Sequence, residues 1–558
     1  MSRRGGLTAL ILGAGALLAA SGGPLVPPEQ EKAAAEITPE LLRAHVRFLA
    51  SDLLEGRGTA TRGDRLAEAY CQAQMEAMGV QPGAPGGEWL QKVPLVGLTA
   101  SFGAPAVFRS GRGGAEGKPG QNLVAVSGIQ APEAKIDGAE VVFVGYGIVA
   151  PEYQWDDYKG ADLKGKVLLI MNNDPEDDPN LFAGKTRLWY GRWDYKYMMA
   201  GRQGAAGAII IHTTHSAGYP WQVVQTSWAG ENFQLPDEGT PRARINMWAT
   251  EELSKTLAEL GGKTLDALRA AAEKRSFRPV PLGVTMSFAL TNAISRRESE
   301  NVIGMIPGAD PALAPEAVFY TAHHDHFGIK PGVKEGADAI YNGAVDNASG
   351  VASILGVAAA FADLPQRPRR SVYFAFVTAE EQGLLGSDYL AKHPPVPAGR
   401  IAVDINIDSA SWFGRARDVS LVGLGKSSVD ADVIALAKWQ GRRVEPDQFP
   451  DQGLFYRSDQ FSLAKVGVPA AYLKFGTDVI GKPEGWGREQ AEYFRKNIYH
   501  QPSDELHDSW DFSGAVEDAR LAFLVGCRIA NADAPPAWNK GDEFEAARKK
   551  ALAELVKP

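Results

Sequence analysis

Apolar runs and amphipathic segments alternate over the C-terminal half of the chain. Short runs rich in β-branched and aromatic residues are separated by segments whose apolar positions have helical spacing, which predicts alternating strands and helices. The predicted strands are 284–290, 302–306, 317–322, 371–378, 401–407 and 470–475, and the predicted helices are 349–361 and 513–530. Strands that are apolar throughout are expected to be buried on both faces. The pattern therefore predicts an α/β fold, a three-layer sandwich with a mostly parallel mixed sheet.

The pattern changes in the N-terminal half. Residues 39–78 are helical in pattern and residues 95–126 are extended, whereas 135–281 contains short β runs, Gly-rich turns and many Trp and Tyr. We therefore predict a main domain made of residues 39–134 and 282–535, with an inserted β-rich domain at 135–281. Residues 536–558 form a charged tail whose amphipathic pattern predicts a surface helix.

The first residues have the layout of a targeting signal. Arg3 and Arg4 precede the apolar run 7–20, which ends in the small residues Ala19-Ala20-Ser21, as in a secretory signal peptide. Residues 1–21 are therefore predicted to be the signal peptide, and 22–38, rich in Pro, Gly and Glu, a flexible leader. The apolar run is too short to span a bilayer comfortably. We expect an exported, periplasmic or extracellular protein with no stable membrane insertion after cleavage.

Composition argues against nucleic acid as a partner and leaves the redox state of the cysteines open. The 558 residues are 45% hydrophobic and 22% charged, which is ordinary for a globular protein. The net charge of -9 and the absence of a long Lys/Arg run argue against nucleic acid as a partner. The two cysteines, Cys71 and Cys527, allow one disulfide or two buried free thiols.

Side chains that bind metals follow the predicted strands. They are His323, Asp346, Glu380, Glu381, Asp408 and His500. In such sheets ligands collect at the carboxyl ends of strands, and two imidazoles with several carboxylates suit two zinc ions. A zinc ion in a hydrolytic site usually takes three protein ligands, so one carboxylate must be shared, and Asp346 is the natural bridge. Two adjacent metals support amide hydrolysis.

The neighbouring carboxylates have separate predicted roles. Of the adjacent Glu380 and Glu381, one can bind a metal while the other accepts a proton from water. Asp325 is placed to accept the second ring N–H of His323. Each motif alone more often has a structural role, but the motifs together, in this order, are far more specific for a metal site. The sequence contains neither a His-Glu-x-x-His helix nor a Gly-x-Ser-x-Gly elbow, so two common rival hydrolase chemistries lack their residues.

The ordered motifs resemble those of the co-catalytic di-zinc aminopeptidases of the peptidase family 28 type. The motifs are Ala-His-His-Asp-His, Gly-Ala-Val-Asp-Asn-Ala-Ser-Gly, Ala-Glu-Glu-Gln-Gly-Leu-Leu-Gly-Ser, Ile-Asn-Ile-Asp and Tyr-His-Gln-Pro-Ser-Asp. The family also contains glutamate carboxypeptidases and glutaminyl cyclases. The resemblance implies the zinc exopeptidase fold, two Zn²⁺ per chain and a cis peptide bond after Asp346. It also implies that the segment 200–211 belongs to an inserted protease-associated (PA) domain.

The resemblance assigns roles to the residues that match its motifs. One zinc would be held by His323, Asp346 and Asp408, and the other by Asp346, Glu381 and His500. Glu380 would be the general base.

We expect an exported zinc-dependent exopeptidase that removes amino-terminal residues from peptides. The basic residues near the motifs that could bind the terminal carboxylate of a substrate are Arg457, Lys474 and Lys330, and they form no visible cluster in the sequence. Glu380 and Asp408, in contrast, could bind a terminal ammonium group. Tyr456 or Tyr472 is the predicted donor to the developing oxyanion. A glutamate carboxypeptidase-like enzyme, a glutaminyl cyclase-like acyltransferase with one zinc, and a non-catalytic binding ectodomain stay open. The preferred residue and the oligomeric state are not predicted.

Overall fold

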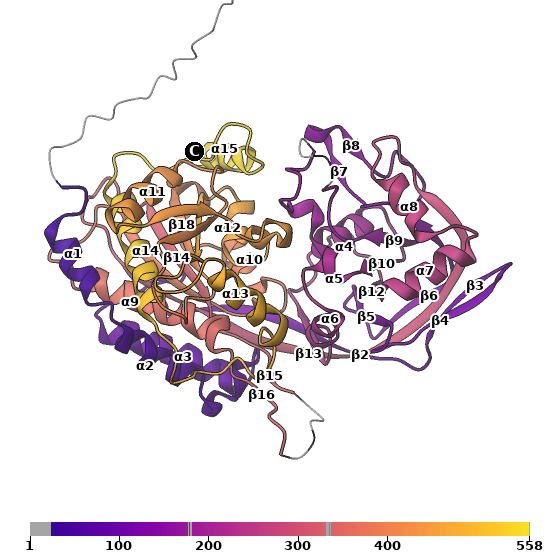
Figure 1. Ribbon diagram of the computed structural model, residues 1–558, viewed down its shortest axis with the longest axis horizontal. Coiled ribbons are helices and arrows are strands. Elements are labelled where there is room, and N and C mark those ends of the chain that lie inside the picture. The colour runs from indigo at the N-terminus through magenta and orange to yellow at the C-terminus, as the bar shows by residue number, and fades with distance from the viewer. Residues whose placement is uncertain (1–23, 177, 179–180, 331–333, 335, 557–558) are drawn as a thin grey trace, which may run out of the picture.

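Two hydrophobic cores lie side by side in the molecule (Figure 1). The computed structural model describes residues 24–556, apart from 177, 179–180, 331–333 and 335. The predicted signal peptide, 1–21, lies outside the described residues. The larger core belongs to the main domain and the second to the inserted domain.

The main domain is built on a mixed sheet with a parallel centre. The strand order is β13 (Val280–Ile306), β17 (Ser371–Val377), β14 (Ala317–His323), β18 (Ile401–Ile407), β21 (Ala470–Phe475), β19 (Asp418–Val422) and β20 (Arg443–Pro446). From β17 to β21 the neighbouring strands are parallel, and the pairs β13–β17 and β21–β19 are antiparallel. The predicted α/β class is confirmed.

Alternation along the central strands creates the two faces of the sandwich. In β14, Val318, Tyr320 and Ala322 belong to the large core, while Ala317 and Phe319 belong to a separate cluster on the opposite face. Successive strand side chains point to opposite faces, so both faces of an apolar strand need cover.

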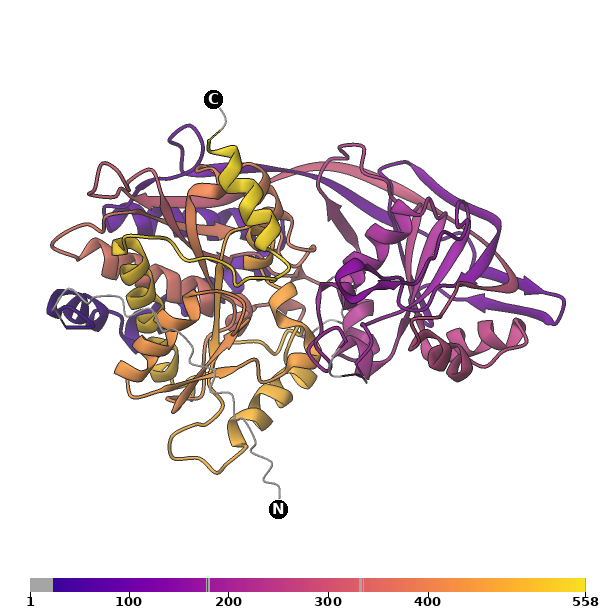
Figure 2. The same ribbon diagram turned by 90° about the horizontal axis from the view of Figure 1, so that it is seen from above.

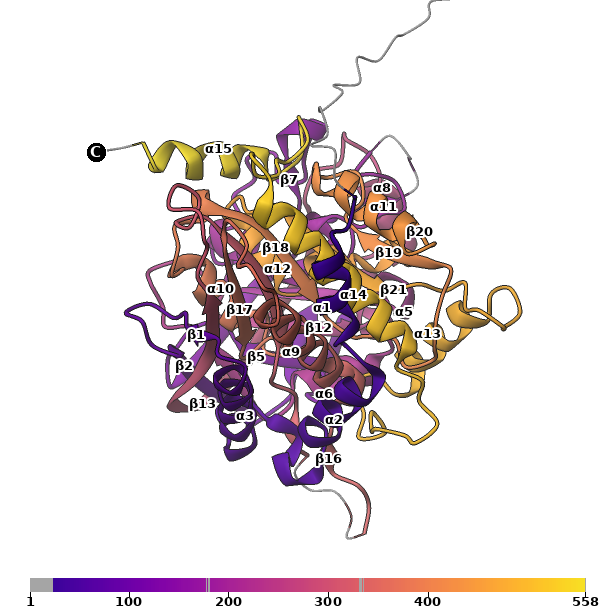
Figure 3. The same ribbon diagram turned by 90° about the vertical axis from the view of Figure 1, so that its left-hand side faces the viewer.

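Helices cover each face of the sheet. The large core includes residues of α2 (Pro39–Leu49), α3 (Arg62–Ala77), α9 (Ser349–Ala362) and α14 (Ser513–Asn531). The opposite cluster includes residues of α10 (Leu385–Lys392) and α12 (Gln460–Lys465). Figure 3 looks onto the side of the molecule where α1, α2 and α14 lie.

The predicted flexible leader contains an ordered helix, which corrects that expectation. Helix α1 (Pro28–Ala35) begins with Pro at its first turn, and its Ala33 and Ala34 are buried. Arg520 on α14 donates hydrogen bonds to the backbone carbonyls of Ala35 and Ile37. The small alanines let α1 pack closely, and this contact offsets the weak intrinsic tendency of an eight-residue helix to form.

The inserted domain is larger than the sequence pattern indicates. Its sheet contains β6 (Glu133–Phe143), β9 (Val167–Met171), β10 (Gly207–His212), β12 (Ile245–Thr250) and β5 (Leu123–Ser127). The core that it encloses runs from Ala106 to Leu290, so the predicted boundaries at 135 and 281 are too narrow. The hairpin β3 (Ala106–Ser110) and β4 (Gly113–Gly117) belongs here because β3 pairs with β13.

One long ribbon connects the two domains. Strand β13 was predicted as two strands, 284–290 and 302–306, but it continues through the polar residues between them. It pairs with β6 in the inserted domain, then with β2 (Leu90–Ser101), then with β17 in the main domain. Figure 2 shows this ribbon crossing from one domain to the other. The intervening residues are largely exposed, so no apolar run marks them as a strand.

Other elements complete the two domains. The remaining longer helices are α4 (Trp193–Arg202), α6 (Trp221–Ser227), α7 (Glu251–Leu260), α8 (Leu265–Ala272), α11 (Val429–Trp439), α13 (Trp486–Asn497) and α15 (Glu545–Glu554). The charged tail is not merely a surface helix, because Arg548 of α15 is buried and donates to the carbonyls of Ala398 and Ile401.

Cys71 and Cys527 are both free and buried. The stretch Ala344–Ala362 is long and apolar enough to cross a membrane, but 94% of it is buried inside the protein.

Candidate metal centre

The candidate ligands meet at one edge of the main sheet. His323 is the last residue of β14, Asp408 directly follows β18, and Glu380 and Glu381 follow β17. Asp346 lies in the turn that leads into α9, and His500 follows α13. Because β14, β17 and β18 are parallel, their carboxyl ends lie together and bring these side chains into one site.

Asp346 lies between the two histidines. Its Oδ1 is 3.2 Å from Nε2 of His323, and its Oδ2 is 3.3 Å from Nε2 of His500. On one side, Oδ1 of Asp408 is 4.0 Å from Nε2 of His323. On the other, Oε2 of Glu381 is 3.2 Å from Nε2 of His500. The two sets share Asp346, as a bridging ligand would require.

The spacing of these atoms fits metal ions rather than hydrogen bonds. Two ligand atoms bound about 2.1 Å from one tetrahedral zinc ion lie roughly 3.4 Å apart. The contacts of Asp346 have this spacing, yet within the described residues neither His323 Nε2 nor His500 Nε2 has a partner with hydrogen-bond geometry. Both nitrogens are buried, where an unsatisfied polar group is costly. A cation on each side of Asp346 would satisfy them.

The electrostatics of the site also favour cations. Burial opposes a charge on His500, yet Glu381 and Asp346 outweigh it and raise its pKa to about 9. Burial likewise opposes ionisation of Asp346, but His323 and His500 hold its pKa well below the ordinary value. Burial raises the pKa of Glu380 well above its usual range, and Glu381 adds to this effect. Carboxylates crowded in this way attract positive charge.

The backbone around Asp346 is held in place by its surroundings. The Asp346-Asn347 peptide is cis, so that prediction is confirmed. The carboxylate of Asp504 accepts N–H hydrogen bonds from Val345 at 2.9 Å and Asp346 at 3.0 Å. Sequence reasoning assigned no role to Asp504, although it ends the Tyr-His-Gln-Pro-Ser-Asp motif, four residues after His500.

Asp325 does not hold His323 in the predicted way. Its carboxylate is 3.8 Å from Nδ1 of His323, and that nitrogen instead donates to the backbone carbonyl of Asp325 at 3.2 Å. The carboxylate accepts the backbone N–H of Glu380 at 3.0 Å and of Glu381 at 3.4 Å. Asp325 therefore orients the Glu380-Glu381 turn.

Two further residues support the ligand loops and were missed from the sequence. His326 is buried, and its Nδ1 lies 2.7 Å from Oε1 of Glu381, so it orients that carboxylate toward His500. Arg57 is also buried and donates to the carbonyls of His324 and Gly343. His326 stands in the Ala-His-His-Asp-His motif and was therefore visible, whereas no local signal marks Arg57.

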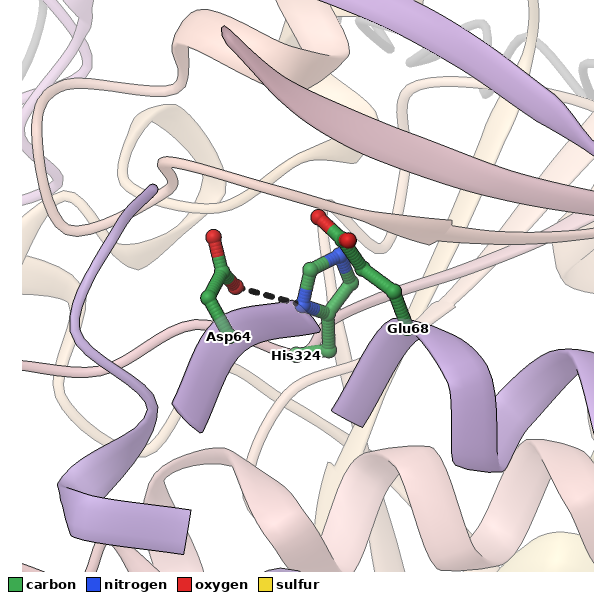
Figure 4. Close-up of side chains that lie close together, drawn as sticks. All are labelled: Asp64, Glu68 and His324. Atoms are coloured by element: carbon green, nitrogen blue, oxygen red, sulfur yellow. Dashed lines mark ion pairs between the residues drawn. The ribbon is translucent and has the colours of Figure 1, made fainter. Parts of the chain in front are cut away.

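A second cluster lies beside the ligand histidine. Asp64 and Glu68 of α3 approach the imidazole of His324 from different sides (Figure 4), and Oδ1 of Asp64 is 3.0 Å from Nδ1 of His324. Ser299 donates to Asp64 at 2.7 Å, and the N–H of Glu300 donates to Glu68 at 3.0 Å. Burial and Asp64 raise the pKa of Glu68 to about 7. The three side chains have metal-ligating atoms, but protein donors also serve both carboxylates.

The chain resembles known aminopeptidases in sequence. It is 26% identical over 388 residues to leucine aminopeptidase 2 of Trichophyton rubrum, covering 67% of this chain and 63% of that protein. It is 33% identical over 139 residues to aminopeptidase NAALADL1 of Mus musculus, covering 23% of this chain and 16% of that protein. The chain thus spans less than two thirds of the length of either relative.

The fold and a family model agree with these alignments. The aminopeptidase from Aneurinibacillus sp. strain AM-1 superimposes with a TM-score of 0.50 at 19% identity, covering 89% of this chain and 95% of that one. The model of peptidase family M28 matches residues 301–524, which contain all five candidate ligands. These residues are similar to peptidase family M28.

The two predicted tyrosines differ in their relation to the M28 site. Tyr456 is buried in another cluster and donates to Glu543 at 2.5 Å, so of the two alternatives it is the one that does not face the site. Its partner comes from the C-terminal tail, which sequence spacing could not reveal. Tyr472 lines the cavity beside Asp408 and Glu380, and Tyr499, which was not predicted, lines it too.

Two clefts open from the M28 site. One is lined by Asp346, Glu380 and Asp408 and by the apolar side chains of Trp412 and Phe449. The other runs between the domains. Its walls include Glu380, Glu381 and His500 from the main domain, and Arg192, Trp193 and Tyr219 from the inserted domain. The site is therefore accessible to a ligand larger than water and is bordered by both domains.

Proposed function

We propose that this chain is a zinc-dependent aminopeptidase that hydrolyses the first peptide bond of its substrates. The observation that carries the proposal is the position of Asp346, whose two oxygens lie 3.2 and 3.3 Å from Nε2 of His323 and His500. The relatives named leucine aminopeptidase 2 and aminopeptidase NAALADL1 support the same class of reaction.

The ligands divide into two sets that share one carboxylate. His323, Asp346 and Asp408 would hold one zinc ion, and Asp346, Glu381 and His500 the other. Two such ions would polarise a peptide carbonyl and lower the pKa of water at the site. His326 orients Glu381, and Asp504 fixes the backbone of Asp346.

Glu380 is the proton acceptor in this proposal. It lines both clefts and lies next to the ligands, with its Oε2 3.9 Å from Nε2 of His323. Glu380 would take a proton from water and deliver it to the departing amine. Asp325 positions it by accepting its backbone N–H.

The negative charge of the site supports removal of residues from the amino end of a peptide. A terminal ammonium would face the carboxylates of Glu380 and Asp408, which line the apolar cleft. That cleft would take the side chain of the first residue, and its aromatic lining favours apolar residues. Tyr472 and Tyr499 are the candidate donors to the developing oxyanion.

Peptides blocked at one end test the direction. The protein should cleave a peptide amidated at its carboxyl terminus and spare one acetylated at its amino terminus, as followed by mass spectrometry. Cleavage confined to the acetylated peptide would instead indicate a carboxypeptidase. A measured content of one zinc with glutamine cyclisation would indicate a glutaminyl cyclase-like acyltransferase.

The proposal includes export. The charged start, the apolar run and the Ala19-Ala20-Ser21 segment support cleavage after residue 21. Amino-terminal sequencing of the protein from the periplasm or the medium of an expressing bacterium should give Gly22. Recovery of only the uncleaved chain in the cytoplasm would contradict it.

A further inference from the structure

The cleft between the domains contains an arginine pair that the proposed reaction does not use. We propose that Arg192 of the inserted domain and Arg457 of the main domain bind a substrate carboxylate beside the scissile bond. The enzyme would then prefer short peptides whose free carboxylate reaches this pair. The inference rests on the proposed aminopeptidase function and adds a substrate class to it.

Arg192 is the first element of this subsite. It occupies the N-cap position of α4 without a side-chain capping hydrogen bond, and it lines the interdomain cleft with a side chain that is only 11% exposed. Within the described residues, its Nε has no hydrogen-bond partner, and its nearest acid, Asp194, is 3.7 Å from that nitrogen. A buried guanidinium N–H without an acceptor is costly. The side chain is therefore available to an acidic ligand.

Arg457 approaches the same space from the main domain. It lines both clefts, and its guanidinium lies over the ring of Tyr219, 5.3 Å from the centroid. Tyr219 belongs to the inserted domain and also lines both clefts. Arg457 also hydrogen-bonds the side chain of Tyr499. Because an arginine has five N–H donors, these contacts leave donors for a ligand. The subsite thus combines the two domains.

The two guanidinium groups repel each other and are close to the reacting carboxylate. Burial lowers the pKa of Arg192, and the charge of Arg457 lowers it further. Glu380 is among the charges that favour protonation of both arginines. A bound carboxylate would remove the repulsion.

The chemistry of the pair selects a carboxylate. The fork of N–H groups on arginine matches the two oxygens of a carboxylate. Because the pair shares a cleft with Glu380 and His500, the bound group must lie near the bond that is cut. Two sources have this chemistry: the terminal carboxylate of a dipeptide, and an acidic side chain in the second residue of a longer peptide.

Three matched substrates test the proposal. We would measure kcat/KM for leucyl-alanine, leucyl-alanine amide and leucyl-glutamate α-amide with the zinc-loaded protein. We expect leucyl-alanine to exceed its amide by about tenfold to a hundredfold, the range for a charge-assisted hydrogen bond. If leucyl-glutamate amide alone exceeds leucyl-alanine amide, the side chain is the source. Equal values for all three would overturn the subsite.

Variants on one helix connect the preference to the arginine. Arg192→Gln should reduce the ratio of leucyl-alanine to its amide toward one, and Arg192→Lys should retain part of it. Arg202→Gln is the matched control, because Arg202 is exposed at the other end of α4, and it should keep the ratio. An unchanged ratio in Arg192→Gln would overturn the role of Arg192.

A binding measurement separates this inference from the proposed function. With Glu380→Gln, calorimetry should detect tighter binding of leucyl-alanine than of its amide, whether or not the wild type turns either over. Preference in binding with no hydrolysis by the wild type would overturn the aminopeptidase function and keep the subsite. Hydrolysis by the wild type without a binding preference for leucyl-alanine would support the aminopeptidase function and overturn the subsite.

Discussion

His323 and His324 are neighbours in sequence but lie in opposite kinds of environment. Nε2 of the buried His323 has three carboxylates, those of Asp346, Glu380 and Asp408, within 4.0 Å, and these carboxylates line a cleft. His324 turns into the protein, where Nδ1 meets Asp64 at 3.0 Å and Nε2 meets the carbonyl of Glu300 at 3.1 Å. Successive side chains at a strand end point to opposite sides, which explains the divergence.

The difference shows that a histidine with carboxylates is not enough to indicate a metal. Around His324 the charges nearly balance, since its own pKa is raised to about 9 and that of Glu68 to about 7. An imidazolium and one carboxylate then neutralise each other. Around His323 the carboxylates outnumber their partners and face open space. We therefore expect metal in the first site and a proton in the second.

Replacing the shared carboxylate should have the largest effect on this contrast. Asp346→Asn is expected to lose both metals and reduce activity to background, because one side chain serves both ions. Metal content by mass spectrometry and kcat/KM for leucyl-alanine are the measurements. A variant that remains active with two tightly bound metals would rule out the bridging role.

Glu380→Gln should separate metal binding from proton transfer. The variant is expected to keep its metals and lose about a hundredfold or more in kcat, because the amide cannot accept the proton. Loss of a metal instead would mean that Glu380 and Glu381 have exchanged roles.

Asp64→Asn tests the second cluster directly. Metal content should be the same as in the wild type at saturation, while metal affinity falls about tenfold, since His324 and the adjacent His323 lose part of their support. Titration with zinc in the presence of a competing chelator measures this. If the variant binds one ion fewer at saturation, the cluster around His324 is itself a metal site.

A third kind of buried histidine gives the smallest expected effect. His45 has a tyrosine partner, with Nδ1 2.9 Å from the hydroxyl of Tyr70, and burial lowers its pKa to about 4. Because the unfolded value is about 6.5, the folded state resists protonation. Its contribution to stability is complete above pH 6.5 and is lost as the pH falls toward 4.

The size of this loss can be measured by urea unfolding. Between pH 7 and 5 the wild type should lose on the order of 2 kcal/mol more than His45→Gln. An identical loss in both proteins would show that His45 is protonated equally in the folded and unfolded states.

The sequence predicted best where local pattern and tertiary environment agree. The strand 401–407 and the strand 470–475 were predicted with the bounds that the structure has, because both are mostly apolar and mostly buried. Strands β19 and β20 were missed because they are short and lie among turns. The five candidate ligands were found because each follows such a run or a distinctive motif.

The other residues of the site depend on contacts distant in sequence. Arg192 and Arg457 line the same cleft only because the inserted domain lies beside the main domain, so the sequence showed no basic cluster. Asp64 is 260 positions before His324 by the numbering, and nothing in its helix marks it as a partner. Tyr456 looked suitable by position, but its orientation is set by Glu543. The position of a residue along the chain predicts which strand end it lies at better than it predicts the direction of its side chain.

The ribbon of β2 and β13 gives the molecule a mechanical property. Twelve consecutive residue pairs, from Thr291 and Ser101 to Val302 and Leu90, connect the inserted domain to the main sheet. Bending this ribbon would strain both strands, and separating them would break ladder hydrogen bonds. The inserted domain is thus carried on a stiff two-stranded arm rather than on a flexible linker. The position of the inserted domain therefore depends in part on that arm, so inserting residues into both strands is expected to shift one wall of the interdomain cleft without changing the metal ligands.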